Sequence, residues 1–199
     1  MFPSILSEVV EYLNSVDIEI SEAHTDGRIN SIFDEGAVVR ILQKKYGEEN
    51  IIDGEDRYWW DYKIYGYPVQ FKSSGFKGAD NWSSKAGILY ALTDLPEEDC
   101  NIVPWAKFQE TLKLNSSQLN PRDYHIIVLN KVTNEVYLTS LKSLNTLTSN
   151  GNNLPFQIKW KDNVVPLKRT WTESYDFLIG AYKESVSKKI GVHNGYEDL

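Results

Sequence analysis

The sequence predicts an α/β protein in which a mixed central β-sheet is flanked by helices. Three segments lead to this fold class. Residues 31–47 carry helix start and stop signals, residues 61–72 alternate around a tight turn like a β-hairpin, and residues 125–129 are a short apolar run typical of a buried strand. Because no repeat or linker interrupts the 199 residues, we expect one domain, 1–199.

The first elements along the chain are expected to be helices. Residues 4–16 form an amphipathic segment close to the N-terminus. In the next helix, 31–47, Ser31 is followed three residues later by Asp34, basic residues occupy the last turns, and Gly47 closes the pattern. Asp34 is therefore interpreted as a capping residue in the first helical turn.

Residues 61–72 are the most informative part of the chain. Side chains alternate between the two faces of a strand, so Gln70 and Lys72 share one face while their apolar neighbours point into a core. With Tyr65–Gly66 as the turn, Asp61 lies directly opposite Gln70. Cross-strand partners are about 5 Å apart at Cβ, and the diagonal neighbour Lys72 is about 7–8 Å from Asp61, so all three side chains can address one phosphate.

These three residue types suit metal-dependent cleavage of a phosphodiester. A hard divalent ion such as Mg²⁺ binds oxygen ligands, which the Asp61 carboxylate and the Gln70 amide oxygen supply. Lys72 would position or deprotonate the attacking water and counter the charge of the transition state. A surface hairpin with ordinary polar residues on its exposed face explains the same spacing without any function.

The remaining signals alternate between short helices and strands, as an α/β fold requires. The expected elements are a strand at 50–52, a helix or turn near 84–91 that Ser83 or Ser84 could cap, strands at 125–129 and 136–139 that pair as a second hairpin, a short helix at 140–147, a strand at 156–160 and a long closing helix at 171–190.

The segment from Asp61 to Lys72, with the polar run that follows it, resembles the PD-(D/E)xK nuclease superfamily, and within it the type II restriction endonucleases. That motif places an Asp at the end of one strand, then a Glu or Asp and a Lys two residues apart on the next. This chain departs from it at Tyr62, which is no second acid, and at Gln70, which a minority of the family shares. The resemblance covers about residues 28–90.

The resemblance implies a restriction-endonuclease-like fold, Mg²⁺ as cofactor, double-stranded DNA as substrate, and Asp61, Gln70 and Lys72 as catalytic residues. Similar nucleases present a helix glutamate to the metal from just before the catalytic hairpin, and Glu35 is the matching position. The metal ligands would then be Asp61, Gln70 and Glu35. The helix dipole also favours an acid early in a helix without any function, so both interpretations of Glu35 stay open.

Candidate DNA contacts lie on either side of the hairpin, where Asn, Ser and basic side chains are suited to phosphates and base edges. An ordinary surface loop would contain the same residue types. The candidates are Lys77, Asn81, Ser83, Ser84 and Lys85 after the hairpin, and Arg28 and Asn30 before the helix that carries Glu35.

The net charge of −7 opposes DNA binding if it is taken over the whole chain. Local charge matters more, because charges beyond a Debye length of about 8–10 Å are largely screened. Residues 63–92 contain four lysines and one acid, Asp80, whereas many of the other acids lie near the two ends of the chain. An acidic enzyme with a locally basic cleft is therefore consistent with the composition.

Other features limit the class of protein. The single cysteine, Cys100, permits no intrachain disulfide and no thiolate zinc cluster. No stretch approaches the roughly 20 apolar residues of a membrane span, and the N-terminus lacks the pattern of a signal peptide. We therefore expect a cytoplasmic protein. The three histidines lack metal-site spacing, and no phosphate loop is present.

Three hypotheses follow. The first is a Mg²⁺-dependent, sequence-specific double-strand endonuclease of a restriction-modification system, acting as a homodimer on a palindromic site. The second is a nicking repair nuclease or junction resolvase of the same fold. The third is a non-catalytic DNA-binding module, which Gln70 in place of an acid favours.

Overall fold

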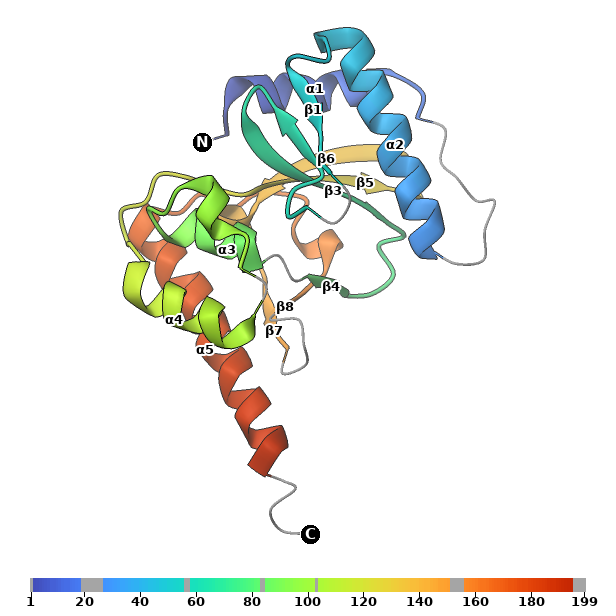
Figure 1. Ribbon diagram of the computed structural model, residues 1–199. Coiled ribbons are helices and arrows are strands. Elements are labelled where there is room, and N and C mark those ends of the chain that lie inside the picture. Colours follow the sequence, from blue (N-terminus) through green and yellow to red (C-terminus); the bar gives the residue numbers. More distant parts are fainter. Residues whose placement is uncertain are drawn as a thin grey trace. The chain divides into compact units, whose positions relative to one another are not determined.

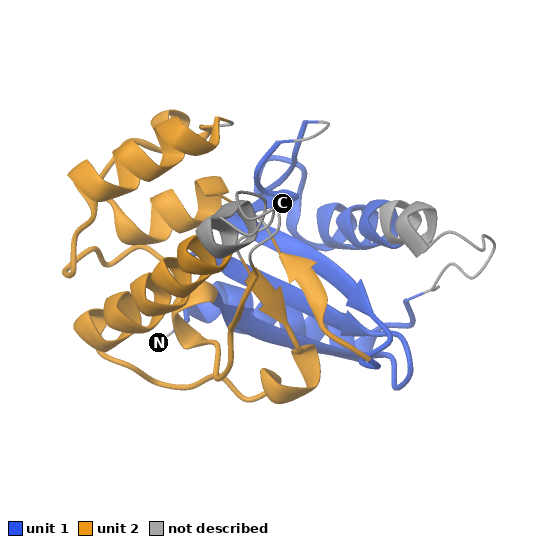
Figure 2. Cartoon of the chain, turned by 90° about the horizontal axis from the view of Figure 1, so that it is seen from below, with its two compact units in different colours: residues 1–77, 124–140 blue, residues 78–123, 141–199 orange. Residues whose placement is uncertain are grey.

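The computed structural model describes residues 2–18, 27–55, 58–82, 85–102, 104–150 and 156–194, without the side chains of 27–33 and 189–194. The chain divides into two compact units, each made of two segments. Unit 1 comprises residues 1–77 and 124–140, and unit 2 comprises residues 78–123 and 141–199 (Figure 2). No helix within the described ranges is long and apolar enough to cross a membrane.

Unit 1 is built on a five-stranded sheet with the strand order β1-β2-β3-β5-β6. The pairing of β3 with β5 is parallel and the other pairings are antiparallel, so the sheet is mixed, as predicted. Figure 1 shows its elements, which are α1 (Ser4–Ser15), α2 (Gly27–Tyr46), β1 (Ile51–Asp53), β2 (Tyr62–Ile64), β3 (Tyr67–Ser74), β5 (His125–Asn130) and β6 (Glu135–Ser140).

The core of unit 1 lies on one face of this sheet. Strand residues that alternate along β3, β5 and β6 point to this face, where apolar side chains of α1 and α2 cover them. The buried residues from the helices are Leu6, Val9, Leu13, Val38, Val39 and Leu42, and those from the strands are Ile51, Tyr62, Ile64, Val69, Phe71, Ile127, Leu129, Val136 and Leu138.

The opposite face of β3 carries the polar residues of the predicted site. Gln70 is beside Ile126 of β5 in the parallel register, and Lys72 is beside Val128. Both polar side chains are half-buried, while the two β5 partners are fully buried. The predicted alternation along β3 is therefore confirmed.

Helix α2 ends as predicted but begins earlier. Gly47 has φ +89°, and its N–H donates to the Gln43 carbonyl at 2.9 Å, which closes the last turn. The helix begins at Gly27 instead of Ser31, because no residue between them breaks a helix as proline does. The capping role predicted for Asp34 is therefore wrong: its buried carboxylate lies mid-helix and pairs with Lys131 Nζ at 2.7 Å.

Unit 2 combines helices with a small antiparallel sheet of order β4-β8-β7. Its elements are β4 (Asp80–Trp82), α3 (Lys85–Leu92), α4 (Trp105–Asn115), β7 (Thr148–Ser149), β8 (Phe156–Ile158) and α5 (Trp171–Asn194), with 3₁₀ turns η1 (Glu97–Cys100), η2 (Leu141–Ser143) and η3 (Trp160–Asp162).

Most of the expected elements of the second half are confirmed. The strands at 125–129 and 136–139, the helix at 84–91 and the closing helix at 171–190 match β5, β6, α3 and α5 within a few residues. The prediction of a helix at 140–147 is wrong, since only the 3₁₀ turn η2 forms there. Helix α4 was missed, although Pro104 precedes it and Trp105, Phe108 and Leu112 share one face.

Candidate active site

The turn of the first hairpin sets the register of the site. Tyr65 and Gly66 have φ values of +48° and +81°, the paired positive values of a type I′ turn. Ile64 then pairs with Tyr67 and Tyr62 with Val69, and the Asp61 N–H donates to the Val69 carbonyl at 3.0 Å. The strand pairing ends at Tyr62 and Val69, so the predicted register is confirmed up to this pair, and the place of Asp61 opposite Gln70 stays a prediction.

The two oxygens of the Asp61 carboxylate have different environments. Oδ2 accepts a hydrogen bond from the backbone N–H of Phe71 at 2.7 Å, which fixes the side chain over the start of β3. Among the described residues, no hydrogen-bond donor reaches Oδ1. One oxygen therefore orients the carboxylate, and the other remains available to a ligand.

Burial raises the pKa of the Asp61 carboxyl above its usual value. The charge of Lys72 and the hydrogen bond from the Phe71 N–H oppose this rise, and the negative charge of Asp53 adds to it. Lys72 therefore lies within electrostatic reach of Asp61, as the diagonal spacing predicts. A carboxylate whose charge is disfavoured by burial gains from a bound cation.

Tyr62 connects helix α2 to the hairpin. Its hydroxyl donates to the Glu35 carbonyl at 2.6 Å. Burial raises the pKa of Tyr62 well above its usual value, and the charges of Asp61, Glu35, Asp53 and Asp34 raise it further. The charges of acids in helix α2, β1 and the hairpin thus act on one phenol.

Asp53 is an acid near the site that the sequence patterns did not single out. It ends β1 and is the register partner of Tyr62, and the N–H of the next residue, Gly54, donates to the Asp61 carbonyl at 2.8 Å. Its charge raises the pKa of Asp61. The available signal was an acid directly after two apolar residues at the end of a predicted strand, as in Ile51–Asp53.

The donor set fits a weakly held Mg²⁺ ion. In the described part of the chain, no three Asp, Glu, His or Cys side chains gather closely enough to hold a metal ion by themselves. Mg²⁺ typically keeps several waters and binds through one or two carboxylates together with substrate phosphates. The open Oδ1 of Asp61 is compatible with that smaller requirement, whereas Gln70 and Glu35 as ligands stay predictions.

The predicted DNA contacts are distributed over both units. Lys77 is exposed just after β3 in unit 1, Asn81 is exposed on β4 of unit 2, and Lys85 is half-buried at the start of α3. Arg28 and Asn30 lie in helix α2, but their side chains are outside the described residues. Ser83 and Ser84 are also outside them.

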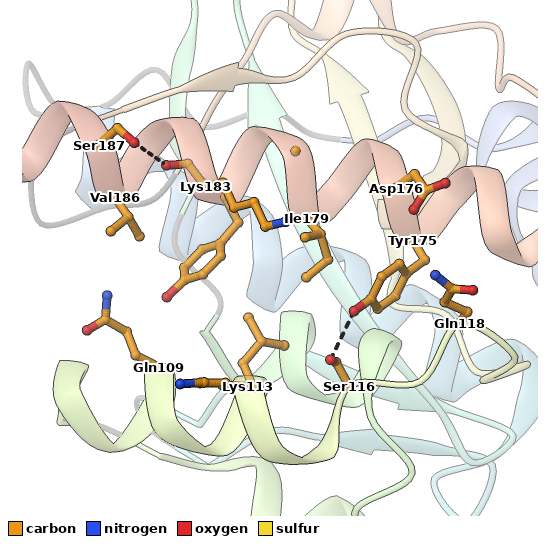
Figure 3. A pocket seen from close by; sticks show the side chains of 13 residues that line it. Gln109, Lys113, Ser116, Gln118, Tyr175, Asp176, Ile179, Lys183, Val186 and Ser187 are labelled. Carbon is orange, nitrogen blue, oxygen red and sulfur yellow. Dashed lines mark hydrogen bonds between the residues drawn. The ribbon is translucent and has the colours of Figure 1, made fainter.

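Unit 2 contains a separate groove of about 890 Å³ between α4 and α5 (Figure 3). The hydroxyls of two of its lining residues, Ser116 and Tyr175, are joined by a hydrogen bond of 3.0 Å. Lys113 and Lys183 also line it, and Asp176 is the one carboxylate among its lining residues. The groove therefore lacks the combination of carboxylate, amide and ammonium that the hairpin provides.

The raised pKa of Asp61 leads to a test of metal binding. Because the folded state binds the Asp61 proton more tightly than the unfolded chain, the stability contributed by this group falls as pH rises through the folded pKa. Asp61→Asn removes the charge and keeps an acceptor for the Phe71 N–H. We expect this variant, without metal at neutral pH, to melt no lower than the wild type.

Mg²⁺ should then stabilise the wild type but not Asp61→Asn. At about ten times its dissociation constant, the ion contributes about 1.4 kcal/mol, or about 3–6 °C in melting temperature for a chain of this size. Thermal unfolding with and without Mg²⁺ measures this difference, with Asp17→Asn, a change at an exposed acid, as the control. Equal Mg²⁺ shifts in wild type and Asp61→Asn would exclude Asp61 as a ligand.

Comparisons with known proteins give limited information. No family model matches the chain, and no curated protein matches it. A solved structure of a restriction endonuclease in complex with substrate DNA aligns with 62% of this chain at 18% sequence identity and a TM-score of 0.32. The aligned part is 50% of that protein, so the chain spans about half of its length. The function of this chain is therefore inferred from its own residues.

Proposed function

We propose that this protein is a Mg²⁺-dependent, sequence-specific double-stranded DNA endonuclease of the type II restriction class. The observation that supports this function is the hairpin geometry. The Asp61 carboxylate accepts the N–H of Phe71, which lies between Gln70 and Lys72 in β3, and the charge of Lys72 acts on Asp61. In the proposed site, a carboxylate, an amide oxygen and an ammonium group would address one phosphate, as hydrolysis of a phosphodiester requires.

Each residue of the proposed site would have its own role in this reaction. Asp61 and Gln70 would hold Mg²⁺, with Glu35 as the further predicted ligand, and the bound ion supplies Lewis-acid activation and neutralises charge on the phosphate. The Lys72 ammonium positions the attacking water and donates hydrogen bonds to the phosphoryl oxygens as their negative charge develops. The Phe71 N–H donates to Oδ2 of Asp61. It would therefore keep the carboxylate oriented while Oδ1 binds the ion.

The DNA duplex would be held by residues that flank the hairpin in the sequence. Lysine side chains contact phosphates, and Asn and Ser side chains contact phosphates or base edges. A homodimer would present two equivalent sites to the two strands of a palindromic sequence. The proposed DNA contacts are Lys77, Asn81, Ser83, Ser84, Lys85, Arg28 and Asn30.

Digestion of a plasmid of mixed sequence tests this function. With Mg²⁺ we expect discrete fragments whose mapped ends share one sequence, and no cleavage in the presence of a chelator. Nicked circles, or cleavage confined to branched DNA, would instead assign the chain to repair or junction resolution. Absence of cleavage with Mg²⁺, Mn²⁺ or Co²⁺ would contradict a catalytic role and leave a DNA-binding module.

A further inference from the structure

The exposed face of the small sheet in unit 2 carries a row of polar side chains. Asn81 of β4 is the register partner of Gln157 of β8, and Gln157 is the partner of Thr148 of β7. Their neighbours Trp82 and Phe156 point to the buried face, where their rings stack with an interplanar angle of 17°. The apolar face therefore holds the sheet in place, and the polar row faces outward.

Hydrogen bonds fix how the two amides of this row are oriented. The Gln157 Nε2 group donates to Asn81 Oδ1 at 3.0 Å, and the Asn150 Nδ2 group donates to the same oxygen at 3.3 Å. Two N–H donors converge on this atom, so it must be the amide oxygen of Asn81. The Asn81 oxygen then accepts two hydrogen bonds, and its N–H₂ group is the part of the amide that could contact a ligand.

The Gln157 amide keeps one donor and one acceptor with which it could contact a base. It donates one of its two N–H groups to Asn81, and among the described residues its second N–H and its Oε1 have no hydrogen-bond partner. A donor and an acceptor side by side on one amide match the N7 acceptor and the N6 amino group of adenine in the major groove. Guanine offers two acceptors at these positions, N7 and O6, and its O6 would meet the Gln157 oxygen.

Hydrogen bonds from helix α5 fix the end of β7, the strand that pairs with the strand of Gln157. Ser185 of α5 donates to the Asn150 carbonyl, and Lys188 Nζ of α5 donates to the Ser149 hydroxyl at 2.7 Å, so the end of β7 is tied to a long helix. Lys159 follows Gln157 by two residues in extended backbone and is exposed. A cation at that spacing, on the same side as Gln157, is suited to an adjacent phosphate.

We infer that Gln157 reads an adenine in the major groove and that Asn81 is the positioning residue that orients it. This inference rests on the proposed function for its substrate, double-stranded DNA, and adds one base of the recognised sequence. It also changes the role of Asn81, which acts through Gln157 instead of contacting a base itself.

Selection of bound duplexes from a randomised DNA library, with the full chain and without divalent metal, tests this inference. We expect wild-type protein to enrich a sequence with an invariant adenine, and Gln157→Ala to lose the preference at that position alone. Affinity for the selected duplex should fall about 5- to 150-fold, the range for one bidentate base contact. Replacing that adenine by 7-deazaadenine should weaken wild-type binding and leave Gln157→Ala binding unchanged.

Two variants of Asn81 and one control separate the positioning role from an effect on folding. Asn81→Asp keeps an acceptor for both N–H donors and should retain the adenine preference, whereas Asn81→Ala should weaken it. Thr148→Ala, in the same row, is the matched control and should keep it. The 7-deazaadenine result on wild-type protein does not depend on any variant folding.

The outcomes distinguish this inference from the proposed function. An unchanged enriched sequence in folded Gln157→Ala, or equal binding of the 7-deazaadenine duplex, overturns the inference even if the wild type cuts DNA specifically. A wild type that shows the Gln157-dependent adenine preference but never cleaves supports the inference and contradicts the endonuclease. Absence of any sequence-selective DNA binding overturns the inference as well.

Discussion

Asp61→Ala and Lys72→Ala are each expected to lower the rate of DNA cleavage by at least about a hundredfold, while the affinity for DNA stays near that of the wild type. Asp61 supplies an oxygen ligand and Lys72 supplies charge to the developing transition state, and such groups typically contribute about 3 kcal/mol or more. Neither side chain belongs to the apolar core cluster of unit 1, so we expect both variants to fold.

Single-turnover cleavage of a defined duplex measures this effect, with DNA binding followed separately without metal. Lys45→Ala is the matched control for Lys72→Ala, since Lys45 is an exposed lysine of the same unit at the end of α2. Circular dichroism establishes that each variant is folded. A folded Asp61→Ala or Lys72→Ala that cuts at the wild-type rate would remove the hairpin from the catalytic centre.

Gln70→Glu is expected to stay at least partly active and to reach its maximal rate at a lower Mg²⁺ concentration than the wild type. A carboxylate attracts a divalent cation more strongly than a neutral amide does, so the wild-type site depends on Asp61 and the scissile phosphate for much of its negative charge. Gln70→Ala removes the predicted oxygen ligand and should be strongly impaired at every Mg²⁺ concentration.

Cleavage rates measured over a range of Mg²⁺ concentrations separate these outcomes. The wild type, Gln70→Glu and Gln70→Ala should differ both in half-saturating Mg²⁺ and in maximal rate. If Gln70→Ala cuts normally across the whole range, Gln70 is not a ligand and its predicted place opposite Asp61 is wrong. If Gln70→Glu requires more Mg²⁺ than the wild type, the amide has a role other than holding the ion.

Local chemistry made the centre of the site predictable from the sequence. A two-residue turn at Tyr65–Gly66 sets the register of the hairpin, and alternation along β3 then assigns a face to Gln70 and Lys72. Both inferences use residues close together in the chain. The closing Gly47 of α2 was predictable for the same reason, because a positive φ favours glycine.

Features that depend on distant residues were not predictable. Asp53 comes near Asp61 only because β1 pairs with β2, and Asp34 is buried mid-helix because Lys131 reaches it from the turn between β5 and β6. The amides of Asn81 and Gln157 are 76 residues apart in the chain and meet only when β4 pairs with β8. Sequence patterns over a few residues carry no information about such pairings.

The location of the metal ion tests the central claim most directly. Fe²⁺ substituted for Mg²⁺, with ascorbate and peroxide, generates hydroxyl radicals that cut the polypeptide next to the bound ion. With a DNA duplex present, we expect the wild-type chain to be cut close to Asp61 and Gln70, and Asp61→Asn to lose these cuts. Cuts confined to other segments, or cuts near the hairpin that persist in folded Asp61→Asn, would contradict a catalytic metal site built on Asp61, Gln70 and Lys72.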